Sequence, residues 1–206
     1  MGLLSVAIWL PIAFGTILLA VGRSENPGAA RWIALVGAIL SFLVTLPLIT
    51  GFHLDTAALQ FQENLVWIER FNVHYFLGVD GISVWFVLLT AFITVIVVIA
   101  GWEVITDRVH QYLGAFLILS GLMVGVFAAA DGMLFYVFFE ATLIPMYIII
   151  GVWGGPNRVY AAFKFFLYTL LGSLLMLVAL VYLYFKSGGS FDIQTWHKLP
   201  LPLNAQ

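Results

Sequence analysis

The chain carries the run GMLFYVFFEATLIPMYIIIGVW at residues 132–153. Glu140 is the one charged residue in this run, and most of the others are large and apolar. A hydrocarbon core of about 30 Å is crossed by about 20 apolar residues in an α-helix, which rises about 1.5 Å per residue. The run therefore predicts a membrane-spanning helix from Gly132 to Trp153 with one carboxyl group near its middle.

Five further apolar stretches of similar length lie on either side of this run. They cover Leu3–Gly22, Trp32–Thr50, Ile82–Trp102, Tyr112–Ala130 and Tyr160–Phe185. Membrane strands are the alternative, but such strands are about 10 residues long and alternate polar and apolar positions. These stretches are longer and do not alternate. The sequence predicts an all-α integral membrane protein with about six transmembrane helices.

The composition agrees with a chain that is mostly surrounded by lipid or by other apolar protein. Of its 206 residues, 63% are hydrophobic and 9% are charged, and the mean hydropathy is +1.09. A soluble domain has about 25% charged residues. The net charge of −2 provides no basic field for nucleic acid. The absence of cysteine excludes disulfides, thiolate metal sites and iron–sulfur ligation by this chain.

The charges around the first stretch indicate a retained span rather than a signal peptide. A signal peptide carries positive charge before its apolar segment, whereas the first cation here, Arg23, follows the stretch. Short cytoplasmic loops are enriched in Lys and Arg. Arg23 and Arg31 follow the first stretch, Arg108 the third and Arg158 the fifth. These positions predict a periplasmic N-terminus and cytoplasmic connections after the odd-numbered spans.

Two long connections divide the predicted chain into four parts. These are two helices in residues 1–50, a periplasmic interfacial loop in 51–81, four helices in 82–185 and a final loop in 186–206. Residues 51–81 are rich in Trp, Phe and Tyr, which gather at membrane interfaces. We expect a short extended segment there, lying on the helix bundle. The last part contains Gly188-Gly189 and Pro200-Leu201-Pro202, and we expect a loop at which a longer chain has been cut.

Glu140 is the first candidate site residue, because no other charge occurs between Gly132 and Asn157. It lies about 13 Å along a helix from Asp131, close to the middle of a bilayer. A charged group there costs about 2.5–3.5 kcal/mol on insertion scales and is by default a functional-site hypothesis. Pro145 deprives a nearby carbonyl of its helical hydrogen bond, which favours a local kink or a water molecule. A protonated carboxyl with a purely structural role is the alternative.

Lys164 is the second candidate, about 9 Å along its helix from Arg158. Lys164, Tyr168 and Gly172 recur at every fourth position, which predicts a polar and small stripe facing the bundle interior. On that reading a water molecule between Glu140 and Lys164 is feasible. The alternative is a lysine whose long side chain reaches back to the membrane surface.

The histidines and glycines give weaker signals. His53, His74, His110 and His197 fall in expected loops or near span ends, and none pairs with another at a metal-ligand spacing. His110 lies beside Asp107 and Arg108 on the predicted cytoplasmic side, so an imidazole there is a candidate point at which protons enter. Gly114, Gly121 and Gly125 share one face of the fourth span and predict close helix packing without a catalytic role.

Three motifs together resemble the proton-translocating antiporter-like subunits of complex I, the NADH–quinone oxidoreductase. They are Leu77–Ser83 (LGVDGIS), Phe139–Met146 (FEATLIPM) and Ala161–Thr169 (AAFKFFLYT). The likeness is nearest to the subunit M branch of the bacterial enzyme, which corresponds to mitochondrial NADH dehydrogenase subunit 4. It extends over the whole chain.

The resemblance implies a fold and a function. The family forms a bundle of fourteen helices with two inverted five-helix repeats, and this chain would supply the first part of that bundle. Glu140 matches the family's span-five glutamate and Lys164 a lysine common in span six. A further lysine on a broken helix would fall beyond Gln206. The resemblance also implies a bacterial inner-membrane location and proton translocation coupled to electron transfer in other membrane-arm and redox subunits.

NADH, FMN, iron–sulfur clusters and quinone are expected to bind to those partner subunits. No site for them is expected in this chain. The alternatives from other classes are a subunit of a multisubunit cation/proton antiporter and a subunit of a membrane-bound hydrogenase. A structural membrane scaffold is a further alternative, which two intramembrane charges disfavour.

Overall fold

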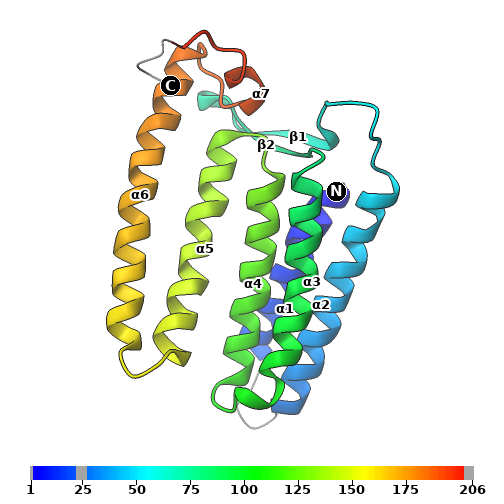
Figure 1. The fold of residues 1–206 in the computed structure, drawn as a ribbon, viewed down its shortest axis with the longest axis vertical. Helices are drawn as coiled ribbons and strands as arrows, with labels where there is room; N and C mark the ends of the chain where they lie inside the picture. Colours follow the sequence, from blue (N-terminus) through cyan, green and yellow to red (C-terminus); the bar gives the residue numbers. More distant parts are fainter. Residues whose placement is uncertain (1, 22–26, 202–206) are drawn as a thin grey trace.

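The structure is a computed structural model that describes residues 2–21 and 27–201. Six long helices stand side by side (Figure 1). They are α1 (Leu3–Val21), α2 (Pro27–Thr50), α3 (Ser83–Val104), α4 (Val109–Ala128), α5 (Gly132–Trp153) and α6 (Arg158–Lys186). All six are long and apolar enough to cross a bilayer, which confirms the predicted fold class. The largest difference from the predicted helix boundaries is at the start of α2. This helix begins at Pro27 rather than at Trp32, because proline is favoured in the first helical turn.

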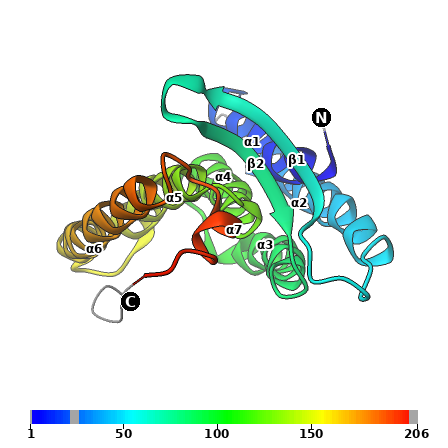
Figure 2. The same cartoon turned by 90° about the horizontal axis from the view of Figure 1, so that it is seen from above.

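The helix order places α4 at the centre and α6 at the edge. Helix α4 packs against α1, α2, α3 and α5, whereas α6 packs mainly against α5. Seen from above, α5 and α6 extend away from the group formed by α1 to α4 (Figure 2). One broad face of α6 is therefore left uncovered by the described chain.

Glycines allow α1 and α4 to approach each other closely. A Cβ atom on Gly121 would lie 2.5 Å from the carbonyl oxygen of Ile8, and one on Gly114 would lie 3.0 Å from that of Gly15. Such distances require a residue without a side chain. The predicted close packing is confirmed at both positions, while Gly125 lies against the ring of Phe138 on α5.

The segment that was expected to be extended forms a β-hairpin across one end of the bundle. Strands β1 (Gln60–Ile68) and β2 (Val73–Val79) pair in antiparallel fashion and are joined by the 3₁₀ turn η1 (Glu69–Phe71). Asn72 closes this turn with a left-handed backbone at φ 52°, a conformation that asparagine tolerates. Leu77 and Val79 of β2 are buried against α1 and α4 in the same cluster as Leu4.

The hairpin is extended by two neighbouring segments. The amide of Ala130, between α4 and α5, donates to the carbonyl of Phe76 at 2.8 Å, and the amide of Ile193 donates to the carbonyl of Ala130 at 3.1 Å. Residues far apart in sequence are thus joined at this end of the molecule, where the described chain also begins and ends (Figure 1).

The prediction of a loop after α6 is wrong for four residues. The short helix α7 (Ile193–Trp196) forms because Asp192 caps it, accepting hydrogen bonds from Gln194 and Thr195 amides. The Trp196 ring is buried and lies where any side chain at Gly132 would collide with it. Burial of this indole stabilises the helix. Residues 202–206 and Arg23, used in the orientation argument, lie outside the described residues.

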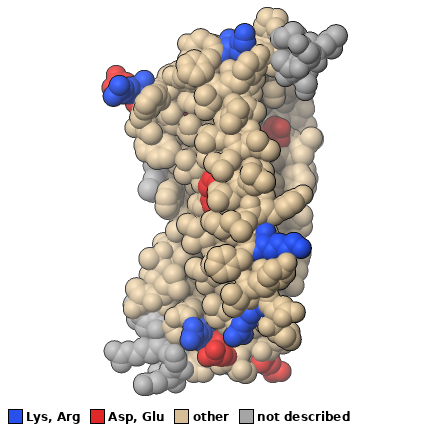
Figure 3. All heavy atoms as spheres, turned by 90° about the vertical axis from the view of Figure 1, so that its left-hand side faces the viewer, with Lys and Arg blue, Asp and Glu red and all other residues tan. Residues whose placement is uncertain are grey.

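The charged side chains follow the pattern expected of a membrane bundle. On the face seen in Figure 3, most Lys, Arg, Asp and Glu atoms lie at the two ends of the molecule, with few between them. Asp80, Asp131 and Glu63 lie at the hairpin end, whereas Asp107, Arg108 and Arg158 lie at the other end with the short α3–α4 and α5–α6 connections.

Candidate functional site

Glu140 lies within α5, about 12 Å along the helix from its start at Gly132. The helix continues without a break through Pro145. Its side chain is partly buried, and its Oε1 atom is fully buried without a hydrogen-bond partner among the described residues. A buried oxygen without a partner is costly for the ionised carboxylate. The site therefore contains a buried carboxyl oxygen that no described side chain or backbone group satisfies.

A tyrosine and a serine accompany Glu140. The Tyr136 side chain, one helical turn earlier on α5, lies near the Glu140 carboxyl group and the Ser173 hydroxyl. Ser173 lies on the face of α6 that packs against α5 and is only 3% exposed. The sequence analysis did not single out either residue. The spacing of Tyr136 and Glu140 was the available signal, since residues four apart are neighbours on a helix.

Lys164 lies on the opposite side of α6 from the helix contact. Ala162, Ser173 and Leu180 are the buried residues of α6, whereas Lys164 is exposed and Tyr168 is 81% exposed. The prediction that the Lys164 stripe faces the bundle interior is therefore wrong for the helices of this chain. Four-residue spacing identified the stripe, but it did not determine which side of α6 meets α5.

The two intramembrane charges do not meet in the described chain. No ion pair joins Glu140 to Lys164 among residues 2–21 and 27–201. The Lys164 Nζ atom lies 5.9 Å from the ring centroid of Tyr160, one turn nearer the start of α6. This direction is the one expected when a lysine reaches toward the membrane surface.

His110 lies in the first turn of α4 and is 8% exposed. This turn adjoins the α5 terminus, since the indole of Trp153 donates to the carbonyl of Asp107 at 2.9 Å. Glu140 is about 20 Å further along α5 from that terminus. The structure therefore places His110 at the end predicted to be cytoplasmic and does not bring it to Glu140.

A second polar site, under the hairpin, was missed by the sequence analysis. Asp131 caps α5 by accepting from the amides of Met133 and Leu134 at 2.9 and 3.0 Å, and it also accepts from the amide of His74 at 3.1 Å. It is 2% exposed, and burial raises the pKa of its carboxyl above the usual value. His74 lies in β2 rather than in a loop.

The hydrogen bonds of His74 and Asn72 extend this polar site to the segment that follows α6. Its Nδ1 atom lies 2.7 Å from Asn64 Oδ1, and its Nε2 atom lies 3.1 Å from Asn72 Oδ1. Asn72 in turn donates to the carbonyl of Gly189 at 3.0 Å. A polar pocket of about 300 Å³ lies among these groups, Asp131 and Asp192. The residues come from segments more than 50 positions apart, so no sequence spacing could reveal them.

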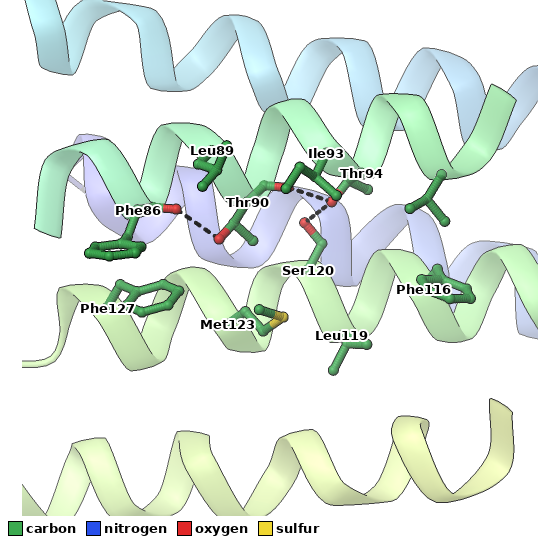
Figure 4. A pocket seen from close by; sticks show the side chains of 11 residues that line it. Phe86, Leu89, Thr90, Ile93, Thr94, Phe116, Leu119, Ser120, Met123 and Phe127 are labelled. Carbon is green, nitrogen blue, oxygen red and sulfur yellow. Dashed lines mark hydrogen bonds between the residues drawn. The ribbon is translucent and has the colours of Figure 1, made fainter. Parts of the chain in front are cut away.

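The largely apolar groove between α3 and α4 has no titratable group in its lining. It has a volume of about 230 Å³ and includes Phe86, Leu89, Met123 and Phe127 (Figure 4). The hydroxyls of Thr94 and Ser120 lie 2.7 Å apart in its wall. Hydroxyls at ordinary pH neither gain nor lose protons, so the groove is not a candidate for a proton-binding site. The described residues also contain no group of three or more His, Asp or Glu side chains suited to a metal ion.

The chain matches two described families along nearly its whole length. Residues 10–128 match "NADH-ubiquinone oxidoreductase chain 4, amino terminus", and residues 129–203 match "NADH:quinone oxidoreductase/Mrp antiporter, TM". NADH-quinone oxidoreductase subunit M of Rhodobacter capsulatus is 50% identical over 203 residues, which cover 97% of this chain and 39% of that protein. The chain thus spans about two fifths of the length of this curated relative.

Solved structures with the same arrangement of helices are known. Respiratory complex I from Thermus thermophilus contains a chain that matches with a TM-score of 0.82 and 34% identity, covering 98% of this chain and 40% of that one. The Mrp complex from Dietzia sp. contains a chain with a TM-score of 0.75 and 19% identity, covering 91% of this chain and 20% of that one. The second match shows a shared fold alone.

These matches confirm the resemblance that the three motifs indicated. The first family covers residues 10–128 of 206, which is more than half of the chain. The chain belongs to the NADH–ubiquinone oxidoreductase chain 4 family.

Proposed function

We propose that this chain is the N-terminal part of a proton-translocating membrane-arm subunit of NADH–quinone oxidoreductase. The observation that carries the proposal is Glu140, a carboxyl group within an apolar span whose Oε1 atom is buried without a partner. The 50% identity to a subunit M supports the assignment to this enzyme. Glu140 is the group that binds and releases the proton.

The physical task of such a subunit is to move a proton through a region without bulk water. A carboxyl group in apolar surroundings holds its proton, and an approaching cation or hydrogen-bond donor favours proton release. A structural change that alternates these two environments around Glu140 would load and unload the group. Such a change can be driven from a distant site when the two sites are energetically coupled.

The electron-transfer chemistry belongs to other subunits on this proposal. NADH, FMN, the iron–sulfur clusters and quinone are bound there, and the partners of this chain are the other membrane-arm subunits and the lipid of a bacterial inner membrane. His110 serves as the point of proton entry on the cytoplasmic side, and Lys164 modulates Glu140 by its charge. The N-terminus and the hairpin face the periplasm.

A subunit of a multisubunit cation/proton antiporter is the second candidate, because the family matched by residues 129–203 includes Mrp antiporters. The two functions differ in their partners. Co-purification of the full-length subunit with flavin and iron–sulfur proteins supports NADH–quinone oxidoreductase. Purification with antiporter subunits alone, together with sodium-dependent proton exchange, supports the antiporter.

Replacement of Glu140 tests the proposal directly. Glutamine has the size of a protonated glutamate and cannot release a proton, so Glu140→Gln is expected to assemble normally and to lose proton pumping by about 100-fold, as for a lost proton-transfer group. Glu140→Asp keeps the titrating group and is expected to retain part of the activity. The measurement is NADH-driven pH-gradient formation in inverted membranes, normalised to assembled complex.

Glu103→Gln is the matched control, because Glu103 is an exposed glutamate at the end of α3. It is expected to pump at the wild-type rate. Wild-type pumping by Glu140→Gln would remove Glu140 from the proton path and leave it a structural carboxyl group.

A further inference from the structure

The chain reverses direction after α6 and returns across the end of α5. Gly188 and Gly189 have positive φ angles of 77° and 94°, which glycine adopts without a steric penalty. Residues 187–199, which we call the strap, then run back across the end of the bundle (Figure 2). At the start of α5 the amide of Gly132 donates to the carbonyl of Phe191 at 2.8 Å. The strap is therefore fixed over the hairpin end of the interface between α5 and α6.

The strap contributes two aromatic rings to a buried apolar cluster. Phe191 and Trp196 are 4% and 9% exposed, and they cluster with Leu180 of α6 and Val73 of β2. The Phe191 ring also stacks on Tyr184 of α6, with the ring centroids 4.4 Å apart. Side chains from the strap, α6 and the hairpin thus meet in one packed group, which we call the apolar cluster.

The apolar cluster extends toward Glu140 along both helices. On α5, Met133 and Tyr136 lie about two turns and one turn before Glu140 and share its face of the helix. On α6, Met176 follows the buried Ser173 by one turn. Met133, Tyr136 and Met176 are partly buried and pack against the cluster. Apolar packing therefore fills the α5–α6 interface between the buried carboxyl oxygen of Glu140 and the hairpin end.

The polar pocket under the hairpin lies on the other side of this packing. Ser190 and Asp192 of the strap line it together with Asp131. The Trp196 indole lies at the boundary, since its ring belongs to the apolar cluster while its Nε1 atom donates to the carbonyl of Ser190 at 2.9 Å. The ring also lies directly against Gly132, where a Cβ atom would collide with it. The indole therefore separates the pocket from the interface that leads to Glu140.

We propose that the strap is a seal that separates Glu140 from water at the hairpin end, and that Trp196 is the side chain that closes it. Protons travel along water molecules and titratable groups, and the apolar cluster provides neither. Exclusion of water from a reacting site prevents proton leakage. The inference rests on the proposed function of Glu140. While the strap is closed, Glu140 exchanges no proton with the hairpin end along the α5–α6 interface.

Removal of the Trp196 indole would connect the pocket to the interface. The space left by the ring would border the polar pocket, and the Ser190 carbonyl would lose its hydrogen-bond donor. A purely apolar cavity stays dry, whereas a cavity with polar partners holds water. Trp196→Ala is therefore expected to admit water to the interface. Trp196→Phe keeps an aromatic ring in place and is expected to stay closed.

The first test measures access to the interface and does not depend on pumping. The full-length subunit carries Met176→Cys and is assembled in its detergent-solubilised complex, and the probe is a charged, water-soluble thiol reagent. The same complex without Met176→Cys gives the background. Labelling is expected to be severalfold faster with Trp196→Ala than with Trp196 or Trp196→Phe. Equal labelling rates in the three backgrounds overturn the inference.

The second test shows whether the opened route passes through Glu140. A seal that no longer closes lets protons return through Glu140, so an imposed pH gradient across inverted membranes is expected to decay severalfold faster in Trp196→Ala than in wild type. Trp196→Ala/Glu140→Gln lacks the group that carries the proton and is expected to decay at the wild-type rate. Trp67→Ala is the matched control, because it removes an exposed indole of the hairpin and should leave the decay unchanged.

The outcomes separate this inference from the proposed function. A leak that persists in Trp196→Ala/Glu140→Gln overturns the inference, because the opened route then bypasses Glu140. Normal NADH-driven pumping by Glu140→Gln overturns the proposed function instead, and the labelling of Met176→Cys still decides whether the strap excludes water. If Trp196→Ala fails to assemble, Trp196→Leu also lacks the ring and takes its place. Faster labelling in that variant supports the seal, and an unchanged rate contradicts it.

Discussion

Glu63 in β1 caps the first turn of α1 through Ser5, a residue 58 positions away in the sequence. The Glu63 carboxylate accepts a hydrogen bond from the Ser5 amide at 3.0 Å and one from the Ser5 hydroxyl at 2.6 Å. It also accepts from the amide of Gly2 at 3.0 Å. Amides at a helix start lack partners within the helix and favour negative charge, so this contact fastens the hairpin to the bundle.

Loss of this cap is expected to destabilise the subunit. Glu63→Ala removes three accepted hydrogen bonds, and we expect the free energy of unfolding to fall by about 1–2 kcal/mol, the usual size of a lost helix cap. The measurement is thermal or denaturant unfolding of the detergent-solubilised protein. Glu69→Ala is the control, because Glu69 is an exposed acidic residue of the same hairpin. Equal stability of the two variants would contradict the capping role of Glu63.

Asp80 is expected to make the stability of α3 depend on pH. The amide of Ser83, 2.6 Å from the Asp80 carboxylate, lowers the pKa of Asp80 below its usual value, helped by the amide of Ile82. A carboxyl group with a lowered folded-state pKa stabilises the fold above its ordinary pKa, and the stabilisation is lost as the pH falls through the folded-state value. Asp80→Ala is expected to cost about 1 kcal/mol at pH 7.

Asparagine provides the matched comparison at this position, because it caps a helix without a charge. The difference in unfolding free energy between wild type and Asp80→Asn is expected to be largest at neutral pH and to shrink as the pH falls below the ordinary Asp pKa of about 3.9 toward the lowered folded-state value. A difference that stayed constant from pH 7 to pH 3 would show that the charge of Asp80 does not contribute.

Orientation in the membrane can be tested with single cysteines, because the chain has none of its own. Ala57 lies in the connection before the hairpin, and Thr106 lies between α3 and α4 at the other end of the bundle; both are exposed. From the positive charge of the cytoplasmic loops we expect an impermeant thiol reagent to label Ala57→Cys in intact cells. Thr106→Cys should be labelled only in inverted membranes, and the reverse pattern would overturn the predicted topology.

The spans were predictable because burial in lipid requires an uninterrupted apolar helix, and this requirement is local in sequence. The 132–153 run defined α5 to the residue. The aromatic segment 51–81 predicted an extended interfacial element, and the structure has a β-hairpin there. By contrast, α7 depends on a cap by Asp192 and on the fit of Trp196 against Gly132, and four residues carry no recognisable periodicity.

The candidate site was predictable in its charged residue and not in its neighbours. Glu140 was evident because an isolated carboxyl group in a span is costly. Its connection to Ser173 depends on which side of α6 meets α5. Spacing alone identified a polar stripe through Lys164, whereas the buried Ser173 shows that the opposite side of α6 meets α5.

Lys164 provides the last test. Its exposed position is compatible with a charge effect on Glu140 and with a side chain that reaches to the membrane surface, and experiment can distinguish these two roles. A stripe of Lys164, Tyr168 and Gly172 is unfavourable on a helix face that meets lipid. Polar and small residues are instead typical of a face that contacts further protein. We therefore expect Lys164→Ala to assemble normally, since alanine favours helix, and to lower pumping severalfold through loss of its charge effect on Glu140. Lys164→Arg keeps the charge and should retain most activity. The measurement is again NADH-driven pH-gradient formation per assembled complex. Wild-type pumping by Lys164→Ala would show instead that the ammonium, which lies over Tyr160, only reaches for the membrane surface.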